Sequence, residues 1–355
     1  MNVLDRYIVR NILGAVLLVM SALLVLGGLA IFIDQQDDIG VGRYTAVGAL
    51  WFTLLNLPQQ AYELLPITAL IGSLLGLGQL ARGSELVVIR ATGVSTQRIA
   101  GAAAIAGLIL IGAELLLGEV LGPPLHEAAK EQKAFSKFNN VSFGGGSGAW
   151  VRDGNLIINV ARQSGQRQFS GMQIFELSPS HRLLAIGHAG GATAGGNRTW
   201  LLTDYSESRF TPDRVLAPPL GQRTMESNVT AGFLGLAVES PAQLTSRALL
   251  RLINYLQANS LSARDYLFAF SSRIARTVAI LFSVLLAIPF VLGSLRSAGA
   301  GTRTLMGLVA GIALFLLQRL IESGTVVFDL NPVLLAWLPT TLLAGVTLLL
   351  LARAR

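Results

Sequence analysis

Long apolar stretches constrain this chain most, because a helix needs about 20 consecutive apolar residues to cross a bilayer. The first stretch covers residues 12–33 and lacks a small-residue cleavage site, which is typical of a retained span rather than a signal peptide. The sequence leaves the placement of residues 44–58 open, and one option is that they lie along the membrane surface before the second span. Five further spans are predicted, which makes six in total. They cover residues 61–81, 99–121, 264–293, 304–325 and 333–352.

A polar segment separates the first three spans from the last three. Residues 125–243 are rich in glycine and serine, and short β-prone runs such as 156–160 and 172–177 recur between turn signals such as Asp153-Gly154. This spacing is typical of an antiparallel β domain, either a sandwich or a jelly roll. The sequence therefore predicts a mainly α-helical membrane protein with six transmembrane helices in a 3+3 arrangement and an antiparallel β jelly-roll insert.

Three segments follow from this arrangement. Residues 1–122 hold the first three spans, residues 123–243 form the β domain, and residues 244–355 hold the last three spans. The third segment opens with Leu249, Ile253 and Leu256 at helical spacing, which predicts an interfacial helix over 244–258.

Arginines in the short loops predict the orientation, because positively charged loops stay on the cytoplasmic side. Most of them fall on one side of the membrane, whereas the opposite short loops offer Arg43 and are otherwise acidic or neutral. The arginine-rich side contains Arg6, Arg10, Arg82, Arg90, Arg98, Arg296, Arg303, Arg353 and Arg355. Both termini are therefore predicted to be cytoplasmic, and the β domain is predicted to lie on the opposite side.

Composition argues against several other functions. The chain is 52% apolar and 13% charged, which leaves too few charges to cover a soluble surface. It has no cysteine, and its three histidines lack the spacing of a zinc site, so no metal or other cofactor is predicted. The sequence contains no phosphate-binding loop, no nucleophile–base constellation and no aromatic-interleaved basic patch for nucleic acid, despite a net charge of +7.

The stretch from Leu65 to Gly93 combines a small-residue helix with a short capped helix. Its glycines permit a neighbouring helix to approach closely. Ser84 is placed as an N-cap, Glu85 lies in the first turn, and Gly93 can adopt the left-handed position after the helix. A loop helix of this kind can simply reverse the chain, but the apolar run 86–89 favours docking, on lipid headgroups or in a groove of another protein.

The same stretch resembles the lipopolysaccharide export permeases of the LptF/LptG family, through the pattern LPxxALxGxLLGLGxLAxxSELVVxxAxG. Further matches are Leu4-Asp5-Arg6-Tyr7-Ile8, Phe32-Ile33-Asp34-Gln35 and Gly293-Ser294-Leu295-Arg296-Ser297, so the resemblance covers the whole chain. It implies an ABC-transporter permease of the Gram-negative inner membrane. Such a permease would extract lipopolysaccharide from the outer leaflet and pass it through a periplasmic β domain towards the outer membrane.

The resemblance also implies partners. A related permease, LptF, would complete a heterodimer, a cytoplasmic LptB dimer would hydrolyse ATP, and the β domains of LptC and LptA would form the periplasmic bridge. The helix at 84–93 would be the coupling helix that sits in the ATPase, so the chain itself would not be an enzyme. The predicted coupling residues are Ser84, Glu85, Leu86, Val88, Ile89, Arg90 and Gly93.

Three lysines after the third span are candidate lipid ligands. Lys130, Lys133 and Lys137 lie at i, i+3 and i+7, on one face if the helix of that span continues past its two prolines. The alternative is an ordinary solvated face; the resemblance favours lipid binding, because family members carry basic residues where Lys130 and Lys133 stand. The chain departs from the family at Asp37-Asp38, where relatives can carry lysines. Acidic side chains there cannot pair with lipid phosphates directly.

Ionisable residues inside the spans are costly and therefore favour a functional interpretation. Counting about 1.5 Å per residue places Glu114, Arg276 and Arg319 at the depth of the outer leaflet, with Arg273 nearer its headgroups. Arg273, Arg276 and Arg319 are therefore candidate ligands of the lipid phosphates. The alternative is a structural ion pair, such as Arg319 with Glu322.

A different function fits the same architecture. In a membrane-anchored scaffold or sensor, the β domain would bind a partner and the helices would only anchor it. Such a protein would tolerate loss of the 82–93 helix, whereas a coupled permease would not.

Overall fold

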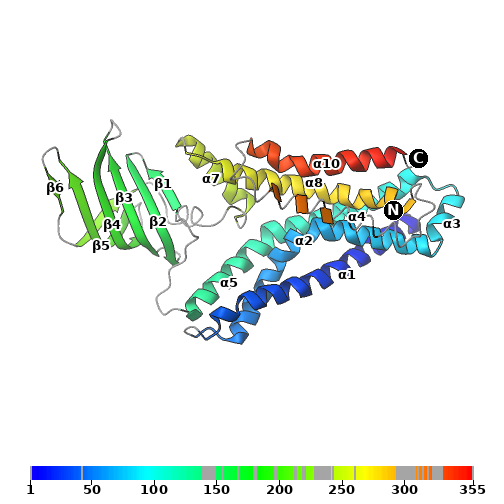
Figure 1. Ribbon diagram of the computed structural model, residues 1–355, viewed down its shortest axis with the longest axis horizontal. Helices are drawn as coiled ribbons and strands as arrows, with labels where there is room; N and C mark the ends of the chain where they lie inside the picture. Colours follow the sequence, from blue (N-terminus) through cyan, green and yellow to red (C-terminus); the bar gives the residue numbers. More distant parts are fainter. Residues whose placement is uncertain are drawn as a thin grey trace. The chain divides into compact units, whose positions relative to one another are not determined.

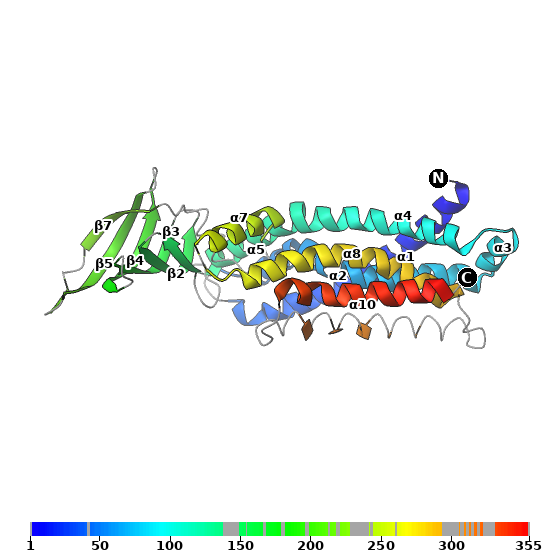
Figure 2. The same ribbon diagram turned by 90° about the horizontal axis from the view of Figure 1, so that it is seen from above.

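The computed structural model forms two compact units (Figures 1 and 2). The helical unit consists of Met1–Gln36, Leu50–Ala129 and Leu267–Arg355, and the β unit of Asp37–Ala49 and Lys130–Tyr266. The described residues are 2–40, 43–137, 149–153, 155–165, 168–178, 182–195, 199–211, 214–217, 221–227, 241, 244–259, 261–292, 305, 309, 312–313, 316–317, 320–321 and 331–353.

Five described helices are long and apolar enough to cross a membrane. They are α1 (Val3–Asp34), α2 (Ala46–Arg82), α4 (Thr96–Leu115) with its continuation, α8 (Arg264–Leu292) and α10 (Pro332–Arg353). Each falls on a predicted span. The sixth predicted span, 304–325, lies largely outside the described residues.

Two of these helices extend further than their predicted spans. α2 is a single helix of 37 residues, so residues 46–58, whose placement the sequence left open, form its first part. α4 continues through the π-helix η2 (Leu116–Leu121) into α5 (Gly122–Lys137). Pro123 and Pro124 come directly after the π-helical segment, at the second and third residues of α5. The helix runs past both prolines as far as Lys137. This continuation is the condition under which Lys130, Lys133 and Lys137 share one helix face.

α1 and α2 cross closely because two glycines of α2 face α1. A Cβ added at Gly72 would lie 2.4 Å from the Val16 Cα, and one at Gly76 would lie 2.8 Å from the Asn11 carbonyl oxygen. This crossing confirms the predicted small-residue helix face. The buried core of the helical unit extends from here to residues of α4, α8 and α10.

Seven strands form one antiparallel sheet in the described part of the β unit. The strands are β1 (Ala149–Asp153), β2 (Leu156–Gly165), β3 (Gln168–Leu177), β4 (Leu183–Ala194), β5 (Thr199–Phe210), β6 (Val215–Leu216) and β7 (Gly221–Glu226). β1 to β5 pair in chain order, and β5 also pairs with β6 and β7 along different parts of its length. The antiparallel insert is confirmed. From β1 to β5 the described strands form a meander, in which strands next to each other in the sequence pair with each other.

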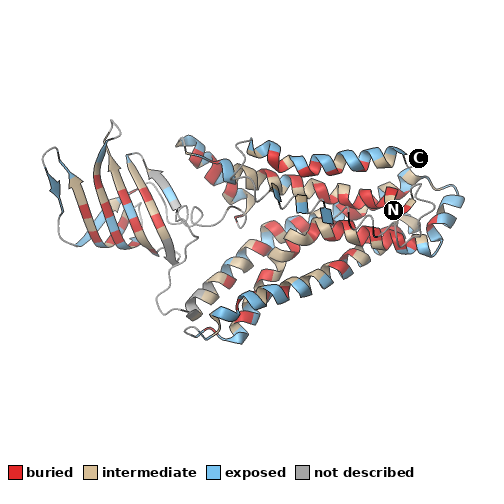
Figure 3. Cartoon of the chain, viewed as in Figure 1, coloured by how far each residue is buried: buried red, intermediate tan, exposed pale blue. Residues whose placement is uncertain are grey.

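One face of the sheet carries the core of the β unit. Buried residues recur along β3, β4 and β5 (Figure 3). The ring centroids of Phe169 and Trp200 lie 5.3 Å apart in this core. The helix predicted over 244–258 is observed as α7 (Ser246–Ala258), which begins after Thr245, whose hydroxyl accepts a hydrogen bond from the Ala248 N–H. Tyr255 of α7 packs against the sheet core.

Candidate functional site

α3 (Glu85–Ala91) occupies the loop between α2 and α4. Gly93 follows it with a φ of 89°, and its N–H donates to the Arg90 carbonyl oxygen at 3.0 Å, which confirms the predicted left-handed end. Ser84 holds the N-cap position with a φ of 57° and makes no side-chain hydrogen bond to the described first turn. The predicted hydroxyl cap is therefore wrong, because such a cap normally needs an extended backbone at this residue.

One side of α3 is anchored in the helical unit and the other is exposed. Leu86 is 2% exposed and belongs to the buried core. Glu85 accepts a hydrogen bond of 2.7 Å from the Tyr7 hydroxyl of α1. Val87 and Val88 are 65% and 61% exposed, on a helix that is largely exposed (Figure 3). Two apolar side chains on an anchored helix form a surface that can dock on another apolar surface.

Lys133, a predicted lipid ligand, lies in an ion pair. Its ammonium is 2.6 Å from Oδ2 of Asp38 and 6.0 Å from the ring centroid of Tyr44. The Arg43 N–H donates to the Ser136 carbonyl oxygen at 2.6 Å, and Tyr44 is buried. The loop between α1 and α2 therefore contacts the end of α5. Burial, and secondly the charge of Asp38, raise the pKa of Tyr44.

The other two lysines lie on the same helix. Lys130 is half-buried in α5. The backbone of Lys137 ends α5, but its side chain lies outside the described part of the chain. Sequence reasoning left the role of Asp37 and Asp38 open and did not predict the Asp38–Lys133 contact. The signal that could have suggested it is an acidic pair at a position where the family can be basic.

The intramembrane arginines of α8 meet charged and aromatic side chains of α2 and η2. Arg273 Nη1 lies 3.0 Å from Glu119 Oε1, and the Arg273 side chain is 11% exposed. The guanidinium carbons of Arg273 and Arg276 lie 6.0 and 5.4 Å from the ring centroid of Tyr62. Glu114, two residues before η2, is fully buried. This geometry favours a structural role for Arg273, and lipid binding by Arg273 and Arg276 stays a prediction.

Arg319 and Glu322 lie outside the described residues, so the predicted pair between them stays a prediction. Of the predicted site residues, Glu85, Leu86, Val88, Ile89 and Arg90 lie on α3, and Ser84 and Gly93 lie beside its two ends. Arg273 and Arg276 lie together beside Tyr62. Lys130 and Lys133 share α5.

Sequence reasoning also missed an ion cluster on the β unit. Arg209 donates to Glu207 at 2.9 Å and to Glu176 at 3.0 Å, and Arg223 pairs with Glu207 as well. The Tyr205 hydroxyl donates to Glu207 at 2.9 Å. Burial by itself would raise the pKa of Glu207, but these hydrogen bonds and the two arginines outweigh it and lower that pKa. The alternation of apolar and polar residues along β5 indicates which side chains face inward. It does not indicate that Arg209 and Glu207 meet Glu176 of β3 and Arg223 of β7.

These features define a class: a membrane protein with several apolar spans, an antiparallel β insert and an anchored, apolar loop helix. The family model for the lipopolysaccharide export system permease LptF/LptG matches residues 6–353, so the chain belongs to this family of transport permeases. It is a permease subunit of a lipopolysaccharide export system.

Two relatives align over nearly the whole chain. The LptG permease of Escherichia coli K12 is 29% identical over 354 residues, which cover 99% of this chain and 98% of the relative. The LptG permease of Haemophilus influenzae is 28% identical over 355 residues, which cover 100% of this chain and 99% of the relative.

Proposed function

We propose that this chain is the LptG-type subunit of a Gram-negative inner-membrane exporter, with cytoplasmic termini and a periplasmic β domain. Together with an LptF-type permease, it takes lipopolysaccharide from the outer leaflet, between the first and fifth spans of the two subunits. The lipid passes over the β domain towards the β domains of LptC and LptA. A cytoplasmic LptB dimer hydrolyses the ATP. The family match and the two LptG relatives support this assignment.

The main structural support for this function is that α3 has one side anchored in the helical unit and one side exposed. Movement of a docked ATPase reaches the spans only through a helix that is fixed to them. The burial of Leu86 and the Tyr7–Glu85 hydrogen bond supply that attachment to the core and to α1. The exposed Val87 and Val88 then supply the docking contact. In this arrangement Glu85 fixes α3 to α1, in addition to any basic residue it meets on the ATPase.

The lipid contact proposed for α5 follows from charge. Lys130 and Lys133 are cationic, and lysine ammoniums form short, charge-assisted hydrogen bonds with phosphate oxygens. Lys133 is held by Asp38, so a lipid phosphate must displace or share that carboxylate. The basic face is therefore available to lipid only in competition with an internal counter-charge.

The experiment that tests the coupling role replaces Val88 by Asp and, as a matched control, the exposed Val3 by Asp. We expect Val88→Asp to lower co-purification of the ATPase about tenfold or more, because an unpaired carboxylate would enter an apolar interface. Lipopolysaccharide release from membrane vesicles to an acceptor β domain should fall in parallel, while Val3→Asp behaves as wild type. Normal ATPase binding and export by Val88→Asp would contradict the coupling role of α3.

A further inference from the structure

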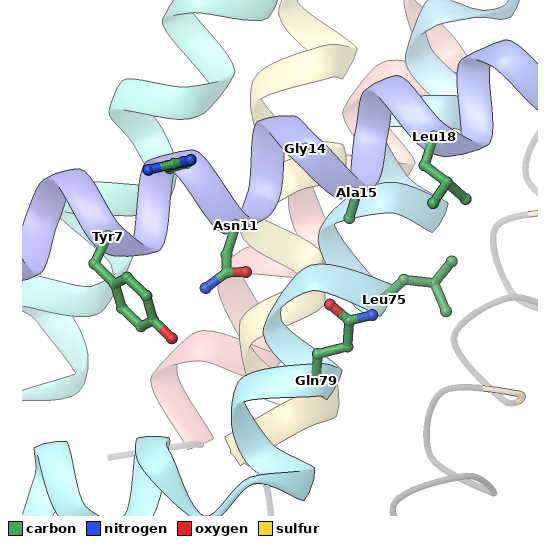
Figure 4. A pocket seen from close by; sticks show the side chains of 8 residues that line it. Tyr7, Asn11, Gly14, Ala15, Leu18, Leu75 and Gln79 are labelled. Atoms are coloured by element: carbon green, nitrogen blue, oxygen red, sulfur yellow. The ribbon is translucent and has the colours of Figure 1, made fainter.

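A groove of about 360 Å³ lies between α1 and α2, close to the N-terminal end of α1 and the C-terminal end of α2. Arg10, Asn11 and Gln79 supply its polar lining, and Gly14, Leu18 and Leu75 supply apolar lining. Figure 4 shows the Asn11 and Gln79 side chains facing each other between the two helices, with Leu75 and Leu18 further along. None of the residues that line this groove is acidic.

The polar and apolar parts of the groove are separated along the helix axes. Arg10 and Asn11 precede the apolar run that begins at Ile12, and Gln79 lies three residues before the end of α2. Leu18 is two turns deeper than Arg10 on α1, about 12 Å, and Leu75 is about 6 Å deeper than Gln79 on α2. The groove therefore offers a cation and amides at the membrane edge and an apolar wall inside the bilayer.

The shape of the groove is set by a rigid crossing. Gly76 contacts the Asn11 backbone, so α1 and α2 cannot close further there. A Cβ added at Gly14 would meet no atom within 4 Å, which shows that the groove is open beside this glycine. Tyr7, which also lines the groove, donates its hydroxyl hydrogen to Glu85 of α3.

We infer that this groove binds an anionic phospholipid of the cytoplasmic leaflet, with the phosphate at Arg10, Asn11 and Gln79 and one acyl chain along Gly14, Leu18 and Leu75. Basic pockets between spans on the cytoplasmic side suit such headgroups. Among the described residues Arg10 has no ion-pair partner, so its charge is available to a phosphate. The lipid would contact the helix segment that holds α3 through Tyr7. The inference rests on the proposed orientation, and it does not depend on the identity of the exported lipid.

The test measures lipids retained by the purified permease complex in native mass spectrometry, after release from nanodiscs of equal parts phosphatidylglycerol and phosphatidylcholine. We expect Arg10→Gln to lower retained phosphatidylglycerol about fivefold, which corresponds to the loss of one cationic contact near an anionic surface. Arg6→Gln removes the same charge from an exposed position of α1 outside the groove, and it should leave retention close to wild type.

A second pair of variants fills the groove without changing charge. Gly14→Leu should lower phosphatidylglycerol retention, whereas Gly101→Leu should not, although a Cβ at either glycine meets no atom within 4 Å. Equal retention in Arg10→Gln and Arg6→Gln, or equal retention of the two phospholipids by wild type, would overturn the inference. Capture of the partner permease by a photo-crosslinker at residue 14, in place of phospholipid, would overturn it as well.

Retention of phospholipid and capture of lipopolysaccharide are separate properties of the complex. Lipopolysaccharide capture by a crosslinker at residue 130 should be unaffected by Arg10→Gln, because the phospholipid contacts different residues. A complex that retains phosphatidylglycerol but never captures lipopolysaccharide would contradict the proposed function alone.

Discussion

At the scale of single residues, two carboxylates, Asp38 and Glu207, form ion pairs with basic side chains. Asp38 pairs with Lys133 on the candidate lipid face. Both side chains are about one-quarter exposed, so this pair is worth about 1 kcal/mol or less and a phosphate can compete with it. We therefore expect Asp38 to weaken, without abolishing, the lipid contact proposed for Lys133.

Removing this counter-charge should strengthen lipid capture. We expect Asp38→Asn to raise lipopolysaccharide capture by a photo-crosslinker at residue 130 by about two- to fivefold, in line with the energy of a partly exposed ion pair. Asp37→Asn is the matched control, because Asp37 is exposed on the same short segment. Reduced capture in Asp38→Asn would mean that the ion pair positions Lys133 for the lipid rather than competing with it.

The second carboxylate, Glu207, gives the β unit an acid-sensitive contact. Its pKa is lowered in the folded protein, so it stabilises the fold above its ordinary value of 4.5, and this contribution is lost as the pH falls through the lowered pKa. Glu207→Gln should therefore speed hydrogen exchange of β5 amides at pH 7, and the difference from wild type should shrink below pH 4.5. Glu226→Gln, at an exposed position of β7, serves as the control. A difference that grows on acidification would contradict this assignment.

At the scale of the elements, the contact between α1 and α2 depends on glycine. Gly72→Ala would place a methyl carbon 2.4 Å from the Val16 Cα, and backbone cannot move aside as a flexible side chain can. We expect a loss of about 1–3 kcal/mol, measured as a lower unfolding temperature of the detergent-purified complex. Gly14→Ala, which meets no atom within 4 Å, should leave that temperature unchanged. Equal stability of the two variants would show that the crossing is looser than described.

The contact between η2 and α8 depends on charge. Arg273→Glu and Glu119→Arg should each lower the yield of folded protein, because each leaves two like charges where a 3.0 Å ion pair stood. The reversed pair, Arg273→Glu with Glu119→Arg, should restore both folded yield and export. If the reversed pair restores folded yield but not export, the ion pair with Glu119 does not account for the role of Arg273. That result would favour a contact between Arg273 and the lipid.

At the scale of the whole molecule, the absence of cysteine makes the orientation directly testable. Single cysteines at Gly221 of β7, Ala91 of α3 and Ala352 of α10 all replace exposed residues. We expect a membrane-impermeant maleimide to label Gly221→Cys in cells with a permeabilised outer membrane. Ala91→Cys and Ala352→Cys should react only after the inner membrane is disrupted. Labelling of Ala91→Cys while the inner membrane is intact would contradict the proposed orientation and would indicate the opposite one.

Local patterns in the sequence predict the elements of this protein well. Apolar length predicts five helices that the structure describes, turn signals predict an antiparallel insert, and Gly93 predicts the end of α3. The side-chain cap at Ser84 departs from expectation, and the order in which the described strands pair was not predicted. Both depend on how a segment meets its neighbours, which residue preferences do not encode.

By itself, the sequence determined that this chain crosses a membrane, carries a β insert and belongs with the export permeases, because hydropathy, turn residues and motifs are local properties. Only the tertiary structure decided the partners of the charges. Arg273 and Glu119 are 154 residues apart, and Glu85 and Tyr7 are 78 apart. Such pairs depend on the rotation and offset of one helix against another. Packing contacts such as the Gly72–Val16 crossing set these offsets, and no single stretch of sequence specifies them.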